Sequence, residues 1–214
     1  YMKKFDISII GGGIVGLATA MYAKEKYPEK TICVFEKENI LAKHQTGNNS
    51  GVIHAGIYYQ PNSQKAKFCW PGSLLLRKFC DQNEIEYEMC GKLIIATKED
   101  EIERLNNLHE RGLKNGVEGL ELIDKQKIKE IEPYVEAIKG LWSPNTGIID
   151  YKKLTEAYAN IFNNNGGLIL KNHELMNIEE NDKSLILETN IGEYETNYLI
   201  NCSGLFADRV AKMM

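Results

Sequence analysis

Three glycines near the start of the chain have the spacing of a turn that binds phosphate groups. Gly11, Gly13 and Gly16 form a GxGxxG pattern directly after the apolar run Phe5 to Ile10. In such turns the first glycine permits a tight bend, the second lets the backbone approach a pyrophosphate, and the third lets the next helix pack closely. The amides that open that helix then offer hydrogen bonds and a partial positive charge to phosphate oxygens. The pattern therefore predicts a dinucleotide site.

An acidic residue stands where the sugar of such a ligand would lie. Glu36 follows the second apolar run, Thr31 to Phe35, about 20 residues beyond Gly16. A carboxylate at this position accepts hydrogen bonds from ribose hydroxyls and repels a 2′-phosphate, which argues against NADP. The alternative is a glycine turn followed by a surface glutamate. The strand–turn–helix context and the acid together favour the dinucleotide site.

The glycine pattern alone does not separate FAD from NAD. Two other segments favour FAD. The polar stretch His44 to Gly51 follows Glu36 closely, and its amides and short side chains suit a long polar ligand. The stretch Asn201 to Gly204 places another glycine at a strand-to-helix turn late in the domain. Either stretch is also compatible with an ordinary turn, so an NAD-dependent dehydrogenase stays open as the alternative.

A parallel sheet is needed to position these residues. Apolar runs at 5–10 and 31–35 flank a predicted helix over 14–26, which makes one βαβ unit. The segment 86–150 differs in character, and α/β material returns after it. We predict an α/β fold with a Rossmann-like FAD-binding domain interrupted by the start of a second, α+β substrate domain. The predicted parts are the FAD-binding domain over 1–85, the substrate domain over 86–150 and the return of the FAD-binding domain over 151–214.

Other elements follow from periodicity and from breaking residues. A helix over 63–82 is predicted to break or kink at Pro71, which cannot donate to the helical ladder. Further helices are predicted over 99–115 and 151–162, and a last one follows Gly204. Short strands are predicted over 87–97, 168–170, 175–178, 184–189 and 198–201. Tyr1, which precedes Met2, is interpreted as a processing remnant.

Composition limits the classes of function. The 214 residues carry a net charge of −4 with both signs mixed, which gives no concentrated basic face for nucleic acid. No run of about 18 apolar residues is present, so no membrane span is expected. The five cysteines show no CxxC or Cys/His spacing. We therefore expect reduced thiols, no metal site and a cytoplasmic location.

A longer motif resembles a known family. The stretch HQTGNNSGVIHAGIYY (His44 to Tyr59), followed by Pro61, Lys65 and Cys69, closely resembles the L-2-hydroxyglutarate oxidase/dehydrogenase family. That family belongs to the FAD-dependent D-amino-acid-oxidase-like group. Segments at 90–92, 143–150 and 200–208 are similar to it as well, so the resemblance covers essentially the whole chain.

The resemblance implies FAD as cofactor and a small 2-hydroxy acid as substrate. L-2-hydroxyglutarate would be oxidised at its CH–OH group to 2-oxoglutarate by hydride transfer to the flavin. Electrons would pass to oxygen or to a membrane quinone chain, the latter with peripheral contact to the inner membrane. It also implies a full-length enzyme about twice this length, whose C-terminal half would be the partner of this chain. Without that half, we expect weak or no flavin retention and no turnover.

The cofactor is expected to contact the glycine turn, the acid, the polar stretch and the late glycine turn. Backbone amides and short side chains of the polar stretch would approach the pyrophosphate and flavin. The expected cofactor-binding residues are Gly11, Gly13, Ile14, Val15, Gly16, Glu36, Lys37, Thr46, Asn49, Ser50, Gly51, Cys202, Ser203 and Gly204.

Oxidation at a hydroxyl-bearing carbon needs a base for the hydroxyl proton, and histidine suits this role near neutral pH. His54 is the catalytic candidate because its segment should pass beside the flavin ring. The alternatives are a structural histidine bonded to loop carbonyls, and a base supplied by the absent half. His44 is the second candidate, interpreted first as a structural or cofactor-contacting residue.

The substrate would be held by cationic and aromatic side chains. Lys65 is the candidate for gripping a carboxylate. Tyr58 and Tyr59 are expected to line the pocket, with core packing as the alternative. Three arginines are expected on solvated helix faces and two histidines at the surface; these are Arg77, Arg104 and Arg111, and His109 and His173.

Two further functions stay open from the sequence. One is a related FAD-dependent oxidoreductase that acts on an amine, an amino acid or glycerol 3-phosphate. The other is a truncated nucleotide-binding fragment without catalysis.

Overall fold

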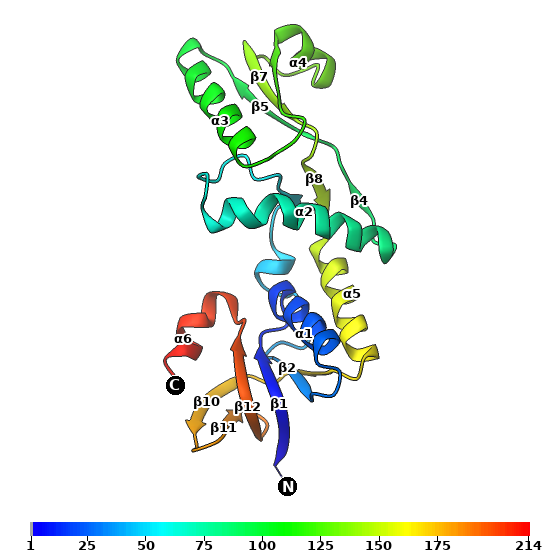
Figure 1. The fold of residues 1–214 in the computed structure, drawn as a ribbon, viewed down its shortest axis with the longest axis vertical. Helices are drawn as coiled ribbons and strands as arrows, with labels where there is room; N and C mark the ends of the chain where they lie inside the picture. Colours follow the sequence, from blue (N-terminus) through cyan, green and yellow to red (C-terminus); the bar gives the residue numbers. More distant parts are fainter. Residues whose placement is uncertain (1) are drawn as a thin grey trace. The chain divides into compact units, whose positions relative to one another are not determined.

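The computed structural model describes residues 2–214, and Tyr1 lies outside the described residues. The chain divides into two compact units (Figure 1). Unit 1 combines the N-terminal segment up to Ser50 with Tyr151–Met214, and unit 2 is the continuous segment Gly51–Asp150. Unit 1 resumes at Tyr151.

The first division differs from the prediction, which placed it after residue 85. Helix α2 (Gln64–Gln82) belongs to unit 2. The reason is its packing, because Trp70 of α2 shares a hydrophobic core with Ala96, Leu105 and Leu141 of unit 2. Sequence composition does not record such a contact between distant segments.

Unit 1 is built on a six-stranded sheet. Its strands are β1 (Lys3–Ile10), β2 (Ile32–Glu36), β9 (Leu168–Lys171), β10 (Leu175–Glu180), β11 (Leu185–Thr189) and β12 (Glu193–Asn201). Their order is β10-β11-β12-β1-β2-β9. The four strands β12, β1, β2 and β9 are parallel, whereas β10, β11 and β12 pair antiparallel. The predicted Rossmann-like α/β fold is confirmed.

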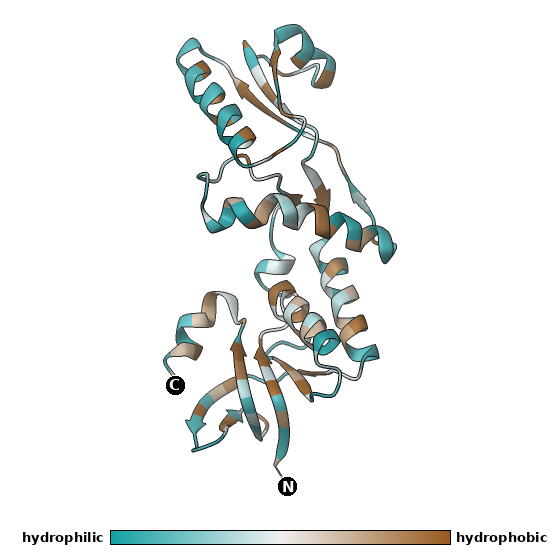
Figure 2. Ribbon diagram, in the orientation of Figure 1, coloured by the Kyte–Doolittle hydropathy of each residue, from teal (hydrophilic) through white to brown (hydrophobic). Residues whose placement is uncertain are grey.

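Helices cover this sheet and connect its strands. They are α1 (Ile14–Lys26), η1 (Gln45–Gly47), α5 (Tyr151–Asn164), η3 (Gly204–Phe206) and α6 (Ala207–Ala211). Helix α1 contacts α5, and its buried face includes Leu17 and Ala20, which are fully excluded from solvent. All five residues of β2 are buried, and its first four are apolar without alternation, as in a strand covered on both faces. Figure 2 shows the hydrophobic residues concentrated on the strands.

Unit 2 holds two small antiparallel sheets. The strands are β3 (Val52–Ile53), β4 (Tyr87–Glu88), β5 (Lys92–Ala96), β6 (Glu121–Asp124), β7 (Lys139–Ser143) and β8 (Gly147–Ile149). Their orders are β3-β8-β4 and β5-β7-β6. Besides α2, the helices are η2 (Glu99–Glu101), α3 (Ile102–Lys114) and α4 (Lys125–Ile131). Helix α2 starts at the Ser63 cap, whose hydroxyl accepts from the N–H of Ala66, and continues through Pro71 without ending there.

No helix among residues 2–214 combines the length and the apolar composition needed to cross a bilayer.

Candidate functional site

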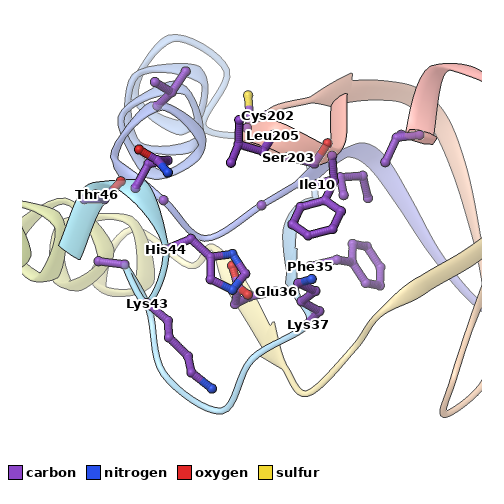
Figure 3. Close-up of a pocket in the computed structure, with 18 of the residues that line it drawn as sticks. Ile10, Phe35, Glu36, Lys37, Lys43, His44, Thr46, Cys202, Ser203 and Leu205 are labelled. Carbon is purple, nitrogen blue, oxygen red and sulfur yellow. The ribbon is translucent and has the colours of Figure 1, made fainter. Parts of the chain in front are cut away.

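Unit 1 contains a cavity of about 840 Å³ at the carboxyl ends of its parallel strands. The last residues of β1 and β2, Ile10 and Glu36, line it, as does Cys202 directly after β12 (Figure 3). Ligands of open α/β sheets bind at this end of the strands. The volume lies within the range of small-molecule and cofactor pockets.

The start of α1 faces this cavity with its backbone amides. Gly13 precedes the helix and has no side chain that could cap it, and the first turn holds no acidic residue. The N–H of Ile14 donates to Thr46 Oγ1 over 3.1 Å, which leaves the hydroxyl hydrogen of Thr46 able to donate elsewhere. An uncapped helix start and a hydroxyl donor are the groups that bind phosphate oxygens.

The first and third glycines hold the turn in a shape that no other residue allows. Gly11 has a φ of +112°, and a side chain there would collide with the carbonyl of Cys202. A methyl group on Gly16 would collide with the carbonyl oxygen of Gly11. Gly13 differs, since a methyl group there would meet only Thr46 Oγ1 at 3.1 Å. Gly11 and Gly16 thus serve close packing, and Gly13 keeps the surface above α1 open.

Glu36 lies beside the glycine turn. Its Oε2 accepts from the N–H of Gly12 over 2.6 Å, and its Oε1 accepts from the N–H of Glu38 over 2.9 Å. The residue is 8% exposed and lines the cavity. A carboxylate has about four acceptor positions, so about two remain for the hydroxyls of a ligand.

A second acid organises the loop on the near side of the cavity. Glu38 pairs with Lys43 over 2.6 Å and with His44 Nε2 over 2.9 Å. The hydrogen bond from Lys43 is the main cause that lowers the pKa of the Glu38 carboxyl. Asn48 donates to the carbonyls of Lys43 and His44, which closes the loop on itself. His44 is therefore held at the cavity edge by its hydrogen bond with Glu38.

An aromatic ring with cationic neighbours, that of Phe206, also lines the cavity. The Nζ of Lys37 lies 3.7 Å from the ring centroid of Phe206, and the guanidinium of Arg209 lies 5.0 Å from it. The ring of His44 is 6.0 Å from the same ring. Burial raises the pKa of the Cys202 thiol, which keeps it protonated at neutral pH. These groups give the cavity a basic and aromatic rim.

His173 also lines the cavity, which corrects its interpretation as a surface residue. It is half-buried, and its ring packs edge-on against Phe35 at 6.2 Å between centroids. No local pattern marks this histidine, because the contact depends on the pairing of β2 with β9.

In unit 2, His54 follows β3 and is exposed. Desolvation, with a smaller contribution from the positive charge of Lys92, lowers the pKa of its ring. The carbonyl oxygen of His54 accepts from the thiol of Cys69 at 3.3 Å. The ring is thus mainly neutral near pH 7, the form in which histidine accepts a proton.

Tyr58 lies over a second hollow, of about 400 Å³, whose lining includes Arg104 and Arg111. The Nζ of Lys92 lies 4.6 Å from the centroid of the Tyr58 ring, and Arg111 Nη1 donates to the Tyr58 carbonyl over 3.2 Å. The prediction that Arg104 is solvated agrees with its exposed side chain, whereas the same prediction for Arg111 is corrected, because Arg111 is half-buried and binds the loop that carries Tyr58.

The loop from Gly56 to Tyr59 is held by one side chain. Asn115 Nδ2 donates to the carbonyls of Gly56 and Tyr59, over 2.9 and 2.8 Å. Arg77, the third arginine interpreted as solvated, contacts Asn145 Oδ1 at 3.4 Å and lies 5.7 Å from the Trp70 ring. Lys65 is exposed in the first turn of α2.

The described chain contains no group of three or more His, Cys, Asp or Glu side chains arranged to hold a metal ion. All five cysteines are free thiols.

A protein-family model described as "DAO: FAD dependent oxidoreductase" matches residues 6–214. The chain belongs to this family. Members of this FAD-dependent oxidoreductase family that resemble it include L-2-hydroxyglutarate dehydrogenase of Indibacter alkaliphilus, 45% identical over 98% of this chain and 52% of that protein. The Escherichia coli K12 enzyme of the same name is 46% identical over 98% of this chain and 50% of its own length. The human mitochondrial enzyme of this name is 45% identical over 99% of this chain and 48% of its own length.

Solved structures agree with the fold. Dithionite-reduced L-α-glycerophosphate oxidase from Mycoplasma pneumoniae, with FAD bound, is 28% identical and has a TM-score of 0.89 over 99% of this chain and 57% of that one. Glycine oxidase from Geobacillus kaustophilus is 20% identical, with a TM-score of 0.84 over 99% and 58%, and shows the shared fold alone. The chain spans about half the length of the curated relatives it matches.

Most residues expected to bind the cofactor line the cavity of unit 1. Those that do are Gly11, Gly13, Ile14, Val15, Glu36, Lys37, Thr46, Asn49, Cys202, Ser203 and Gly204. Within the described chain, Gly16, Ser50 and Gly51 do not line it. Gly16 instead supports the turn, and Gly51, with a φ of +68°, begins unit 2. The candidates His54, Tyr58, Tyr59 and Lys65 all belong to unit 2.

Proposed function

We propose that this chain is the FAD-binding and partial substrate-binding region of an enzyme that oxidises L-2-hydroxyglutarate to 2-oxoglutarate. The sequence identity of 45–46% to dehydrogenases of that name supports the substrate. Membership of the FAD-dependent oxidoreductase family supports the cofactor. The observation that carries the proposal is the uncapped start of α1 beside a carboxylate with acceptor positions to spare.

The residues of unit 1 fit the ADP half of FAD. The amides at the start of α1 and the hydroxyl of Thr46 would hold the diphosphate. Glu36 would accept hydrogen bonds from the ribose, since Gly12 and Glu38 occupy only part of its acceptor capacity. Lys37, Asn49, Ser203 and Gly204 would complete the walls around the cofactor. Ser50, which ends the first segment of unit 1, and Gly51, which begins unit 2, would also contact it.

Unit 2 would act on the substrate. FAD, when bound, supplies the acceptor for the hydride that leaves C2 of the hydroxy acid. His54 would take the hydroxyl proton, because its lowered pKa leaves the ring neutral. Lys65 would grip a carboxylate, and Tyr58 and Tyr59 would line the substrate. The substrate would leave as 2-oxoglutarate. Its hydroxyl proton would stay on His54, and its C2 hydrogen would be accepted as hydride by the FAD that the site would hold.

The rest of the enzyme would complete the site. The curated relatives are about twice as long as the part that this chain matches, so the polypeptide corresponding to their other half is the proposed partner. We propose oxygen or a membrane quinone as the final electron acceptor. The enzyme would be cytoplasmic, with peripheral attachment to the inner membrane in the quinone case.

Flavin bleaching tests the proposal. The full-length enzyme carrying this chain is mixed anaerobically with L-2-hydroxyglutarate, D-2-hydroxyglutarate, glycine or glycerol 3-phosphate. We expect loss of absorbance near 450 nm with L-2-hydroxyglutarate only. Bleaching by glycine or glycerol 3-phosphate, but not by L-2-hydroxyglutarate, would overturn the proposed substrate. It would favour a related FAD-dependent oxidoreductase that acts on an amino acid or on glycerol 3-phosphate. A colourless enzyme that reduces NAD would overturn the cofactor assignment.

A further inference from the structure

The turn between β9 and β10 is fastened to the strand that ends at Glu36. The N–H of His173 donates to the carbonyl of Glu36 over 2.9 Å, and the N–H of Asn172 donates to that of Glu38 over 3.0 Å. Asn172 has a φ of +59°, a left-handed conformation that costs free energy in any residue with a side chain. This turn therefore needs support from its side chains.

The side chain of His173 supplies that support through both ring nitrogens. Nδ1 lies 2.8 Å from the carbonyl oxygen of Lys171, and Nε2 lies 2.8 Å from the hydroxyl of Tyr194. A carbonyl oxygen only accepts, so Nδ1 must carry the hydrogen, and in the neutral ring Nε2 must accept from Tyr194. The two contacts fix one tautomer and one ring orientation.

Tyr194 is itself held in an aromatic cluster beneath the cavity. Its ring stacks on Phe5 at 6.2 Å and packs edge-on against Phe35 at 5.0 Å. Burial raises the pKa of its hydroxyl, so the group stays protonated and donates to His173. The hydrogen-bonded pair thus links β12 to the turn that fastens the end of β2.

We infer that His173 is a positioning residue, set by Tyr194, that fixes Glu36 for recognition of the ribose hydroxyls of the bound dinucleotide. The inference rests on the proposed function, because it assigns Glu36 to a ribose. It adds that sugar recognition depends on a histidine from a turn about 137 residues away along the chain, a group outside the glycine fingerprint.

Sugar discrimination separates positioning from general stability. The dissociation constants of ADP and of 2′,3′-dideoxy-ADP are measured for the chain by NMR titration, which reaches millimolar values. In the unsubstituted chain we expect ADP to bind about fivefold or more tightly than the dideoxy compound, the worth of a hydrogen bond. In His173→Phe and Tyr194→Phe we expect this ratio to fall toward one, while the affinity for the dideoxy compound changes less than about twofold.

Two further variants and one spectrum complete the design. His173→Asn places an amide donor near the position of Nδ1–H and should restore part of the ratio. His109→Phe, on α3 of unit 2, is the matched control and should leave the ratio unchanged. The ¹⁵N spectrum of His173 should show a protonated Nδ1 and an unprotonated Nε2.

The outcomes are distinct. An unchanged ratio in His173→Phe, with ADP still bound, would overturn the inference and leave the proposed function standing. If His173→Phe lost affinity for ADP and for the dideoxy compound equally, in proportion to its lost stability, the inference would also be overturned. That result would show that His173 has a structural role alone. No binding of ADP by the unsubstituted chain and none by the full-length enzyme freed of its flavin would overturn the ribose assignment and the proposed function with it.

Discussion

The N–H of Gly12 donates to Glu36 Oε2 over 2.6 Å, which joins the middle of the glycine turn to the end of the neighbouring strand. The contact fixes the carboxylate between the start of α1 and the cavity. It also satisfies a buried backbone donor, since Gly12 is excluded from solvent. One side chain thus stabilises the turn and presents acceptors to a ligand.

Replacing the Glu36 carboxylate should weaken both ligand binding and the stability of the glycine turn. In Glu36→Ala we expect ADP affinity to fall about tenfold and stability to fall by about 1–3 kcal/mol, because a buried N–H loses its acceptor. Isothermal titration calorimetry or NMR titration measures the ADP affinity, and urea unfolding measures the stability. Glu174→Gln, at an exposed acid that also lines the cavity, is the control and should change neither by much. Unchanged ADP binding in Glu36→Ala would contradict the assignment.

The glycines should respond differently to alanine. Gly16→Ala should destabilise unit 1 by about 3 kcal/mol or more, because its methyl group meets backbone and not a movable side chain. Gly13→Ala should lower stability little but weaken ADP binding several-fold. Gly72, exposed within α2, has nothing within 4 Å of an added methyl group, so Gly72→Ala should stabilise by about 0.5–1 kcal/mol. Thermal unfolding of the three variants ranks them, and a stable Gly16→Ala would refute the packing account.

The pKa of His54 should depend on Lys92. Desolvation is the larger cause of its lowered pKa and the Lys92 charge the smaller, so Lys92→Met should raise the pKa without restoring the ordinary value. A histidine whose pKa is lower folded than unfolded binds protons more weakly when folded. Its contribution to stability is therefore complete above pH 6.5 and is lost as the pH falls toward the folded pKa. Histidine NMR titration of both forms checks the direction, and a fall on removing Lys92 would contradict it.

The loop that carries Tyr58 and Tyr59 should loosen without Asn115. Asn115→Ala removes hydrogen bonds to the carbonyls of Gly56 and Tyr59, worth about 1 kcal/mol each. Hydrogen exchange should quicken over residues 56–59 while β1 and β12 keep their protection. Asn107→Ala, at an exposed position on α3, the helix that Asn115 follows, is the control. Equal exchange in the two variants would mean that the loop is held by other contacts.

The thiols should react in an order set by burial. Cys90 is exposed and should react first with a disulfide reagent. Burial raises the pKa of Cys33 to about 12 and that of Cys80 to about 11, which removes nearly all thiolate at neutral pH. Both should react only as fast as the protein opens, so urea should accelerate them far more than Cys90. Prompt labelling of Cys33 in the folded protein would show that β2 is not the buried strand described.

Much of unit 1 follows from local sequence signals. The glycine turn, the helix over 14–26 and the buried run before Glu36 each carry a complete local signature, and α1 has the predicted bounds. Only the second half of β12 is predicted from the sequence, over 198–201. Its first half, from Glu193, is polar and charged, which is typical of a turn. That half becomes a strand only by pairing with β1 and β11.

The features of unit 2 and of the cavity that the sequence does not predict have a common cause. Strand β6 (Glu121–Asp124) has charged residues at both ends and pairs through β7, so it gives little local signal. The division after residue 50 depends on Trp70 reaching the core of unit 2. His173 enters the site through Tyr194, a partner in another strand. Local periodicity describes elements, whereas these features arise from contacts between elements.

The placement of β1 between β2 and β12 also sets an order of events at the ribosome. Lys3 of β1 pairs with Tyr194 of β12, so the earliest of the described strands waits for the latest of them before its sheet is complete. Residues 51–150 emerge as one uninterrupted stretch and can reach their own core during that delay. Nascent chains of about 190 residues, stalled at that length, should therefore protect the middle of the polypeptide from proteases while its beginning is still cut.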